Sequence, residues 1–279
     1  MAYPASMRAS CIPLQATLLN TPDIELWPGG LLHARSNAHA RLLARAQRVL
    51  RRKRDGQYLA AALAEGLQPL IPNLGREPGL ASAKRALAQD AARHRNGLER
   101  VATLPLHRMQ VRLEILGLDA DRYAARSGLA LIPEPTQLRF AGFDRWRRPL
   151  WLAPGAARAW GRMQDAALEA GIVLEAISGY RSHDYQLGIF ERKLARGQTL
   201  DEILAVNAAP GFSEHHSGLA LDIGTLDDPP AEQSFETTPA FVWLQTHAPG
   251  HGFHMSYPRD NPHGIVYEPW HWRYASTAI

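Results

Sequence analysis

Two short segments near the C-terminus contain residue types that together could hold and use a metal ion. The first supplies His215 and Asp222, and the second supplies Glu268 and His271. A catalytic zinc usually takes three nitrogen or oxygen ligands from protein and leaves its fourth position to water, whose pKa falls to roughly 7. His215, Asp222 and His271 can be those ligands. Glu268 can then move the proton of that water to a leaving group, so the pattern predicts a zinc hydrolase.

The chain around Asp222 has the alternation of a strand. Leu219, Leu221 and Ile223 would face the core, which leaves Asp222 on the opposite face. Gly218 permits a turn that folds His215 back over this strand. The spacing therefore predicts that His215 and Asp222 address the same space.

Glu268 and His271 require a bend between them. Residues three apart on a regular strand point to opposite faces. Pro269 makes a bend credible at this position. With that bend, both side chains can address one metal ion.

Each of these residues also has a simpler interpretation. His215 could cap a loop, and an aspartate at a strand end often bonds only nearby backbone amides. Of the 12 histidines, eight lie between His183 and His271, and His216 is the nearest alternative ligand or a residue that supports one. We assign loop or surface roles to His247, His251, His254 and His263.

The two segments resemble the VanY-type D-alanyl-D-alanine carboxypeptidases. The first segment matches Ser-x-His-x-x-Gly-x-Ala-x-Asp from Ser213 to Asp222, and the second matches Glu-x-Trp-His-x-Arg from Glu268 to Arg273. The resemblance covers about residues 128 to 274. It rests further on Ser178-Gly179-Tyr180-Arg181-Ser182 with Gln186, and on Trp243-Leu244, Gly252-Phe253 and Tyr257-Pro258.

The resemblance implies an activity and roles for the site residues. It implies hydrolysis of the terminal D-alanine of peptidoglycan stem peptides, with one zinc per chain held by His215, Asp222 and His271. Glu268 would be the general base, and Arg181 would stabilise charge on the substrate. Arg181, Gln186 and Ser213 would bind the peptide terminus.

The resemblance also implies a fold and a domain division. We expect an α+β domain over residues 128–279, in which a small, mainly antiparallel sheet with flanking helices carries the zinc site. Helices are predicted over Pro154 to Ala170 and Tyr185 to Arg196, with a buried strand over Ile172 to Ile177. Residues 1–127 would form a basic, mostly helical accessory region.

The expectation for the first 127 residues rests on charge and periodicity. They carry 19 Lys+Arg against 10 Asp+Glu, whereas residues 128–279 carry 12 against 17. Apolar residues between Leu42 and Leu50 recur at helical spacing, and further helices are predicted near Gln57 to Ala64 and Ala81 to Leu104. We interpret the basic run Arg51 to Arg54 as a solvated helix end. If it binds anything, an anionic cell-wall polymer or membrane surface fits better than nucleic acid.

Several alternatives stay open. On the same substrates, the enzyme could be an L,D-carboxypeptidase, a dipeptidase or an endopeptidase, and we expect loops Thr225 to Pro239 and Pro258 to Tyr267 to decide. A non-haem iron oxygenase also uses two histidines and a carboxylate, but usually with closer spacing than that of His215 and Asp222. A non-catalytic zinc-holding module is the third class, and it would have no use for Glu268.

Composition limits location and redox chemistry. The single cysteine, Cys11, excludes an internal disulfide and a cysteine-based zinc site, and we expect it to be inert. No window of about 18 apolar residues predicts a transmembrane helix. Met1 to Leu19 has one basic residue and no continuous apolar stretch, which makes a poor secretory signal. That expectation conflicts with the cell-envelope or periplasmic location that the resemblance implies.

Overall fold

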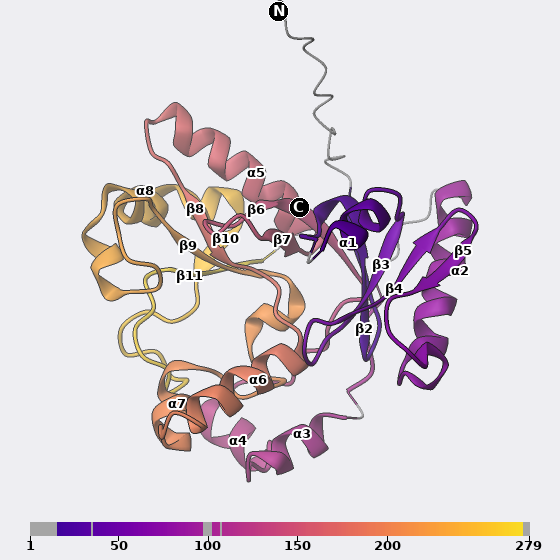
Figure 1. The fold of residues 1–279 in the computed structure, drawn as a ribbon. Helices are drawn as coiled ribbons and strands as arrows, with labels where there is room; N and C mark the ends of the chain where they lie inside the picture. The colour runs from indigo at the N-terminus through magenta and orange to yellow at the C-terminus, as the bar shows by residue number, and fades with distance from the viewer. Residues whose placement is uncertain (1–15, 35, 97–101, 107, 276–279) are drawn as a thin grey trace, which may run out of the picture.

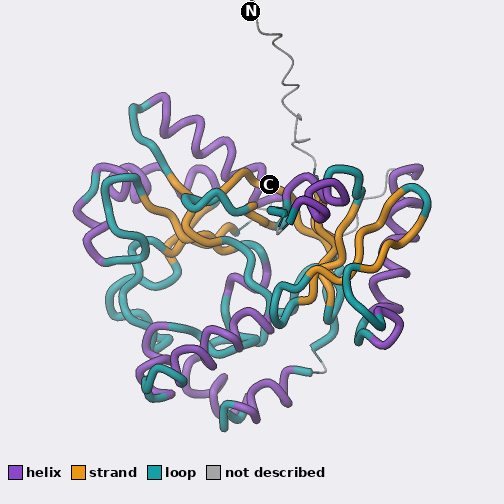
Figure 2. Tube along the Cα trace, in the orientation of Figure 1, coloured by secondary structure: helices purple, strands orange, loops and turns teal. Residues whose placement is uncertain are grey.

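The fold contains two antiparallel sheets with helices around them. The computed structural model describes residues 16–34, 36–96, 102–106 and 108–275, and Cys11 lies outside these ranges. Figure 1 shows one sheet built mainly from the N-terminal part of the chain and another built from the C-terminal part, and Figure 2 shows the loops and helices between them. The predicted α+β class with a mainly antiparallel sheet is confirmed.

The smaller sheet has four strands in the order β10-β11-β9-β8, and its neighbouring strands are antiparallel. Asp222 of β9 lies opposite His271 of β11 in this register. The strands are β8 (Glu175–Ser178), β9 (Ala220–Gly224), β10 (Phe253–Met255) and β11 (His271–Tyr274). The strand predicted at residues 219–223 is therefore present, whereas the one predicted at 172–177 begins later, at Glu175.

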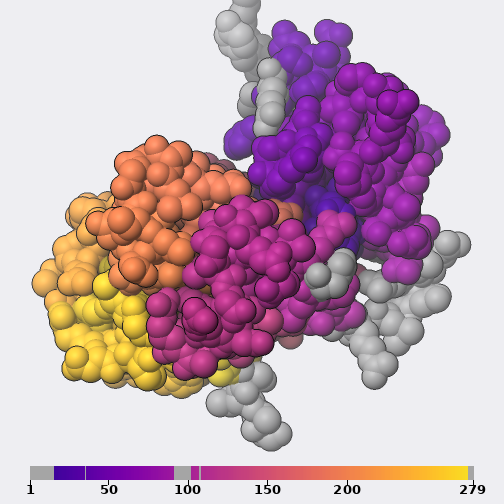
Figure 3. All heavy atoms as spheres, turned by 90° about the horizontal axis from the view of Figure 1, so that it is seen from below, coloured from indigo at the N-terminus to yellow at the C-terminus, as the bar shows by residue number. Residues whose placement is uncertain are grey.

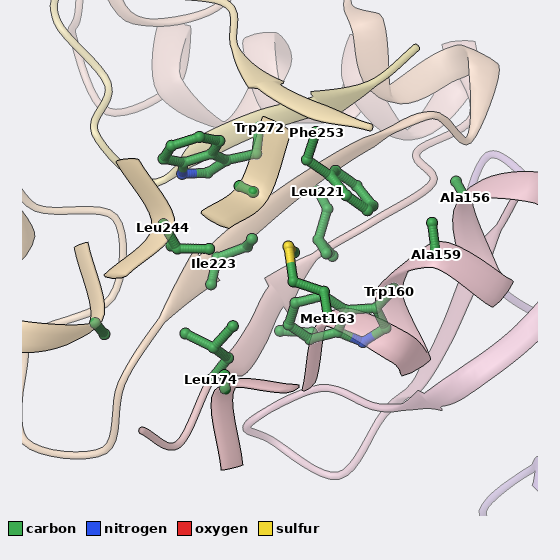
Figure 4. Close-up of a cluster of buried hydrophobic side chains, with 14 of the residues drawn as sticks. Ala156, Ala159, Trp160, Met163, Leu174, Leu221, Ile223, Leu244, Phe253 and Trp272 are labelled. Carbon is green, nitrogen blue, oxygen red and sulfur yellow. The ribbon is translucent and has the colours of Figure 1, made fainter. Parts of the chain in front are cut away.

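Helix α5 (Pro154–Glu169) packs on one face of this smaller sheet. Its Trp160 and Met163 contact the same buried cluster as Leu221 and Ile223 of β9 (Figure 4). Fully burying one such side chain stabilises a fold by about 1.5–3 kcal/mol. This packing fixes the orientation of β9, so Asp222 points to the opposite face, as the alternation predicted.

Four further helices form a second layer near the smaller sheet. They share a buried cluster that includes Leu113, Tyr123, Phe190 and Phe212. Figure 3 shows the magenta part of the chain, which contains α3 and α4, against the orange part. The helices are α3 (Met109–Ile115), α4 (Ala120–Ser127), α6 (His183–Leu194) and α7 (Leu200–Val206). The helices predicted over residues 154–170 and 185–196 are confirmed as α5 and α6.

The larger sheet corrects the prediction for the N-terminal region. It has seven antiparallel strands in the order β5-β4-β3-β2-β1-β6-β7, and five of them come from residues 17–69, a part of the chain predicted to be mostly helical. The strands are β1 (Thr17–Asn20), β2 (Ile24–Pro28), β3 (Arg48–Arg52), β4 (Tyr58–Leu63), β5 (Gly66–Pro69), β6 (Gln137–Phe143) and β7 (Pro149–Leu152). The helices beside it are α1 (Asn37–Leu43) and α2 (Leu80–Asn96).

The error has a physical cause in β3 and β4. Val49 and Leu50 are both fully buried, because β3 lies between β2 and β4 and is covered on both faces. Adjacent buried apolar residues then imitate helical spacing. Ala60 and its neighbours in β4 favour helix intrinsically, but pairing and burial override that preference. The helix predicted from Ala81 is present as α2.

The larger sheet crosses the predicted domain boundary. Strand β1 pairs with β6, so residues on both sides of position 127 belong to one sheet. Helices α3 and α4, from the predicted accessory region, pack with α6 and α7. The division at 127/128 stays a prediction.

The basic run lies on β3 and the turn after it, not at a helix end. Arg51 pairs with Glu25, Arg52 with Glu77 and Lys53 with Glu134. Much of the positive charge is therefore neutralised within the protein, which reduces the charge available to bind an anionic surface.

The remaining elements are short. None of the described helices is long and apolar enough to cross a membrane. These remaining elements are α8 (Pro239–His247) and the 3-10 turns η1 (Gly29–Leu31), η2 (Leu74–Arg76), η3 (Glu214–Ser217), η4 (Gln233–Thr237) and η5 (Ala248–His251).

Candidate active site

A cleft of about 730 Å³ lies beside the face of the smaller sheet opposite α5. The structure brings every predicted site residue to its wall. These residues are Arg181, Gln186, Ser213, His215, Asp222, Glu268 and His271. Residues from the two loops predicted to shape the cleft, Glu232 and Ile265 among them, also line it.

Three of these side chains form a compact buried group. One ligand atom from each of His215, Asp222 and His271 lies within 4.8 Å of the others. Nε2 of His215 lies 3.3 Å from Oδ2 of Asp222, and Nδ1 of His271 lies 3.0 Å from Oδ1 of Asp222. The cross-strand register of β9 and β11 sets the second of these contacts.

A sharp turn delivers His215 to this group. Gly218 has φ +68°, and a Cβ atom there would meet Leu138 at 2.5 Å and the backbone nitrogen of Ala153 at 2.9 Å. Nδ1 of His215 hydrogen-bonds the Gly179 carbonyl at 2.7 Å, which places the proton on Nδ1 and the lone pair on Nε2. Burial and then the charge of Arg181 lower the pKa of His215 to about 4, so its ring is neutral at pH 7.

His271 is held by a carboxylate on each side. Its Nε2 lies 2.9 Å from Oε2 of Glu214, and its Nδ1 faces Asp222. Burial opposes its charged form, but the hydrogen bonds to Asp222 and Glu214 outweigh burial and raise the pKa of His271 to about 10. A metal at Nδ1 must therefore displace a proton.

The three residues fit a divalent metal. Nε2 of His215 is buried and has no well-aligned hydrogen-bond partner among the described residues. Burial raises the pKa of Asp222, but His215 and His271 outweigh it and hold the pKa far below its usual value. Two imidazoles and one carboxylate form a donor set that suits zinc and leaves a position open.

Glu268 lies beside this group, at a bend before β11. The backbone N–H of His271 donates to the Glu268 carbonyl at 3.1 Å, which closes the turn that Pro269 was expected to allow. Oε2 of Glu268 lies 3.8 Å from Nδ1 of His271. Burial raises the pKa of Glu268 to about 7, a value suited to a group that exchanges protons near neutral pH.

The predicted substrate-binding residues lie on α6 and the segments before and beyond it. The guanidinium of Arg181 is 3.9 Å from Asp222, and its side chain is 20% exposed. Gln186 donates to the Ala208 carbonyl at 2.9 Å, while its buried Oε1 has no hydrogen-bond partner in the described ranges. Ser213 is buried at the start of η3.

His216 faces away from the metal group. Its Nε2 accepts from the Gly211 N–H at 3.0 Å, and its Nδ1 donates to the Arg181 carbonyl at 2.7 Å. It therefore supports the segment that carries Arg181 and does not supply a ligand. Within the described ranges, the other four histidines assigned to loops and surface are absent from the cleft wall: His247, His251, His254 and His263.

Sequence reasoning missed the roles of Glu214, which contacts His271, and of two residues of the cleft wall, Tyr257 and Lys193. Glu214 holds His271, Tyr257 places its ring 4.8 Å from that of His271, and Lys193 lines the wall with Arg181. The position of Glu214 between two predicted site residues, Ser213 and His215, was a sequence signal that it belongs near the site. Nothing in the spacing shows that its carboxylate reaches β11.

The fold and the site define a class of protein. It is an α+β protein with two buried histidines and a carboxylate beside a proton-exchanging glutamate. A family model described as VanY, D-alanyl-D-alanine carboxypeptidase, matches residues 149–277. The chain belongs to this family, as its motifs predicted.

Individual relatives agree with the family match. The bifunctional D-Ala-D-Ala dipeptidase and D-Ala-D-Ala carboxypeptidase VanXYC of Enterococcus gallinarum is 35% identical over 147 residues, which cover 50% of this chain and 75% of the relative. YodJ of Bacillus subtilis (strain 168) is 41% identical over 136 residues, or 47% of this chain. The chain spans 49% of the length of YodJ.

Among solved structures, the LdcB LD-carboxypeptidase is 35% identical with a TM-score of 0.43. That match covers 46% of this chain and 61% of LdcB.

Proposed function

We propose that the protein is a zinc-dependent D-alanyl-D-alanine carboxypeptidase that removes the terminal D-alanine of peptidoglycan stem peptides. The observation that carries the proposal is the convergence of His215, Asp222 and His271 with Glu268 beside them in one cleft. Membership in the VanY family supports the peptidase class and the substrate class.

His215, Asp222 and His271 would hold the zinc, one ion per chain. When bound there, zinc would supply a water of lowered pKa and polarise the carbonyl of the bond to be cut. The neutral ring of His215 and the ionised Asp222 are in the states that a metal requires.

Glu268 would move the proton. Its carboxylate takes a proton from the attacking water and gives it to the departing amine of D-alanine. Its buried position beside His271 keeps it close to the reaction, and burial raises its pKa in the metal-free protein to about 7, which favours proton exchange.

Arg181 would hold the oxygen that gains negative charge. A planar guanidinium can grip an oxyanion or carboxylate with two hydrogen bonds. Ser213 and Oε1 of Gln186, which has no hydrogen-bond partner among the described residues, would contact the peptide terminus. Lys193 adds a second positive charge to this wall.

The placement of Glu268 counts against a non-catalytic zinc-holding module. Such a module has no use for a buried carboxylate with a raised pKa beside its metal ligands. We also propose the cell envelope as the location of the protein, because the proposed substrate is peptidoglycan.

The test is hydrolysis of defined stem peptides. A pentapeptide ending in D-Ala-D-Ala, a tetrapeptide ending in one D-alanine and the free D-Ala-D-Ala dipeptide would each be incubated with zinc-loaded protein. We expect rapid release of D-alanine from the pentapeptide. Preferred cleavage of the tetrapeptide would favour the L,D-carboxypeptidase alternative, and preferred cleavage of the dipeptide would favour the dipeptidase alternative. No cleavage of any peptide would contradict the proposal.

A further inference from the structure

We propose that the larger sheet positions the active site, with Lys53 and Glu134 as positioning residues that hold the segment carrying Arg181. The inference rests on the proposed function, because that function gives Arg181 its role. Lys53 and Glu134 both lie outside the residues that the family model matches, 149–277.

Glu134 is the centre of a buried polar network. Its side chain is 3% exposed and forms an ion pair with Lys53, whose side chain is 1% exposed. Oε2 of Glu134 also accepts from the Tyr180 hydroxyl at 2.6 Å and from Nδ2 of Asn20 at 3.0 Å. Oε1 accepts from the backbone N–H of His183 at 2.8 Å. One carboxylate therefore joins four partners.

These partners come from two separate parts of the fold. Asn20 ends β1, and Lys53 directly follows β3, so both belong to the larger sheet. Tyr180 lies in the connection from β8 to α6 and His183 is the first residue of α6, so the two residues flank Arg181. The carboxylate thus ties this connection to the sheet.

The tie reaches the metal group through the backbone of Arg181. Its N–H donates to the His215 carbonyl at 3.3 Å, and its carbonyl accepts from Nδ1 of His216 at 2.7 Å. The ring of His183 packs edge-on against that of His216, with centroids 4.4 Å apart. A shift of the residues beside Arg181 would therefore move its guanidinium relative to His215.

Electrostatics makes the tie depend on Lys53. Burial raises the pKa of Glu134, but the charge of Lys53 and then that of His183 outweigh burial and hold the pKa far below its usual value. Without Lys53, the carboxylate would be a buried charge that has lost the lysine paired with it. It would draw in water or a proton, and its hydrogen bonds to Tyr180 and His183 would weaken.

The test compares Lys53→Met with Arg45→Met, a matched loss of a cation from the same N-terminal part of the chain. Arg45 pairs with Glu65 at the surface, where the two side chains are 65% and 60% exposed. Hydrogen exchange would be followed at the amides of residues 180–183. We expect exchange to rise about tenfold or more in Lys53→Met and to stay at the wild-type rate in Arg45→Met.

Kinetics then separates positioning from stability. A displacement of about 1 Å near the reacting atoms can lower turnover by about 100-fold, so kcat/KM for D-alanine release should fall about 10- to 100-fold in Lys53→Met with zinc content unchanged. Because Lys53 would act through Arg181, adding Lys53→Met to Arg181→Ala should cause no further loss. Additive losses, or unchanged kcat/KM with faster exchange, would overturn the proposal.

A second variant covers the case in which Lys53→Met does not fold. The pair Lys53→Met with Glu134→Gln leaves no unpaired charge, and it should fold with faster exchange at residues 180–183. Wild-type exchange in that pair would overturn the proposal. If wild-type protein cleaves no peptide, the proposed function fails, and exchange alone decides whether Lys53 holds this segment.

Discussion

Asp222 and His271 face each other directly across the β9–β11 pair, with Nδ1 of His271 3.0 Å from Oδ1 of Asp222. Strand pairing, rather than a flexible loop, therefore fixes two of the three proposed ligands relative to each other. His215 joins them through a turn that is itself closely packed. Such a site is largely preorganised before metal binds.

Zinc binding should release a proton from His271. The pKa of His271 is raised to about 10 in the metal-free protein, so its ring is charged at pH 8 and must lose a proton to bind metal at Nδ1. Calorimetric titration with zinc, in buffers of different ionisation enthalpy, should report release of about one proton from this ring. Identical heats in all buffers would show that His271 enters the site already neutral.

Glu214 should set the affinity of the site for zinc. A carboxylate on the outer nitrogen of a ligating histidine orients the ring and raises its basicity, and its loss typically costs about 10- to 100-fold in metal affinity. We expect that loss in Glu214→Ala, measured by competition with a zinc-binding dye. Arg273→Met is the control, because Arg273 approaches the other oxygen of Glu214 at 3.5 Å and is not a proposed ligand. Equal zinc affinity in wild type and Glu214→Ala would show that Glu214 does not contribute to metal binding.

The carboxyl group of Glu268 should titrate near pH 7 in metal-free protein and lower when zinc is present. Burial raises its pKa to about 7, and a nearby dication favours the ionised form. The base form is the active one, so kcat/KM should fall as pH decreases through the lower, zinc-bound value. Carbon NMR of labelled glutamate would follow the titration, with Glu268→Gln identifying the resonance. A pKa that zinc leaves unchanged would place Glu268 away from the metal.

Gly218 should be intolerant of a side chain. Gly218→Ala adds a Cβ that meets Leu138 and the Ala153 backbone. Gly171 has a similar φ of +74°, but a Cβ there lies more than 4 Å from every described residue other than its chain neighbours. We expect Gly218→Ala to lower the free energy of unfolding by about 1–3 kcal/mol more than Gly171→Ala, in urea titrations of metal-free protein. Equal losses would mean that backbone conformation alone explains the glycine.

The site was more predictable from sequence than the N-terminal fold. His215, Asp222 and His271 lie in two short motifs whose residue types suit a zinc site. The resemblance of both motifs to the VanY family assigned the three residues to one site. Glu214 and Glu134 reach partners on distant segments, His271 and Lys53, and no local pattern shows such contacts.

The N-terminal strands could not be read locally for a different reason. Leu50 and Ala60 are paired and fully buried inside a sheet, where long-range pairing outweighs intrinsic helix preference. The pairing of β1 with β6 joins residues more than 100 positions apart, and periodicity within one segment carries no information about it.

The central claim is that Glu268 performs proton transfer at a zinc held by three other residues. The direct measurement is zinc content together with D-alanine release from a pentapeptide, for wild type and Glu268→Gln. We predict about one zinc per chain in both proteins and D-alanine release by wild type alone. Release at the wild-type rate by Glu268→Gln, or absence of both zinc and cleavage in wild type, would contradict the account.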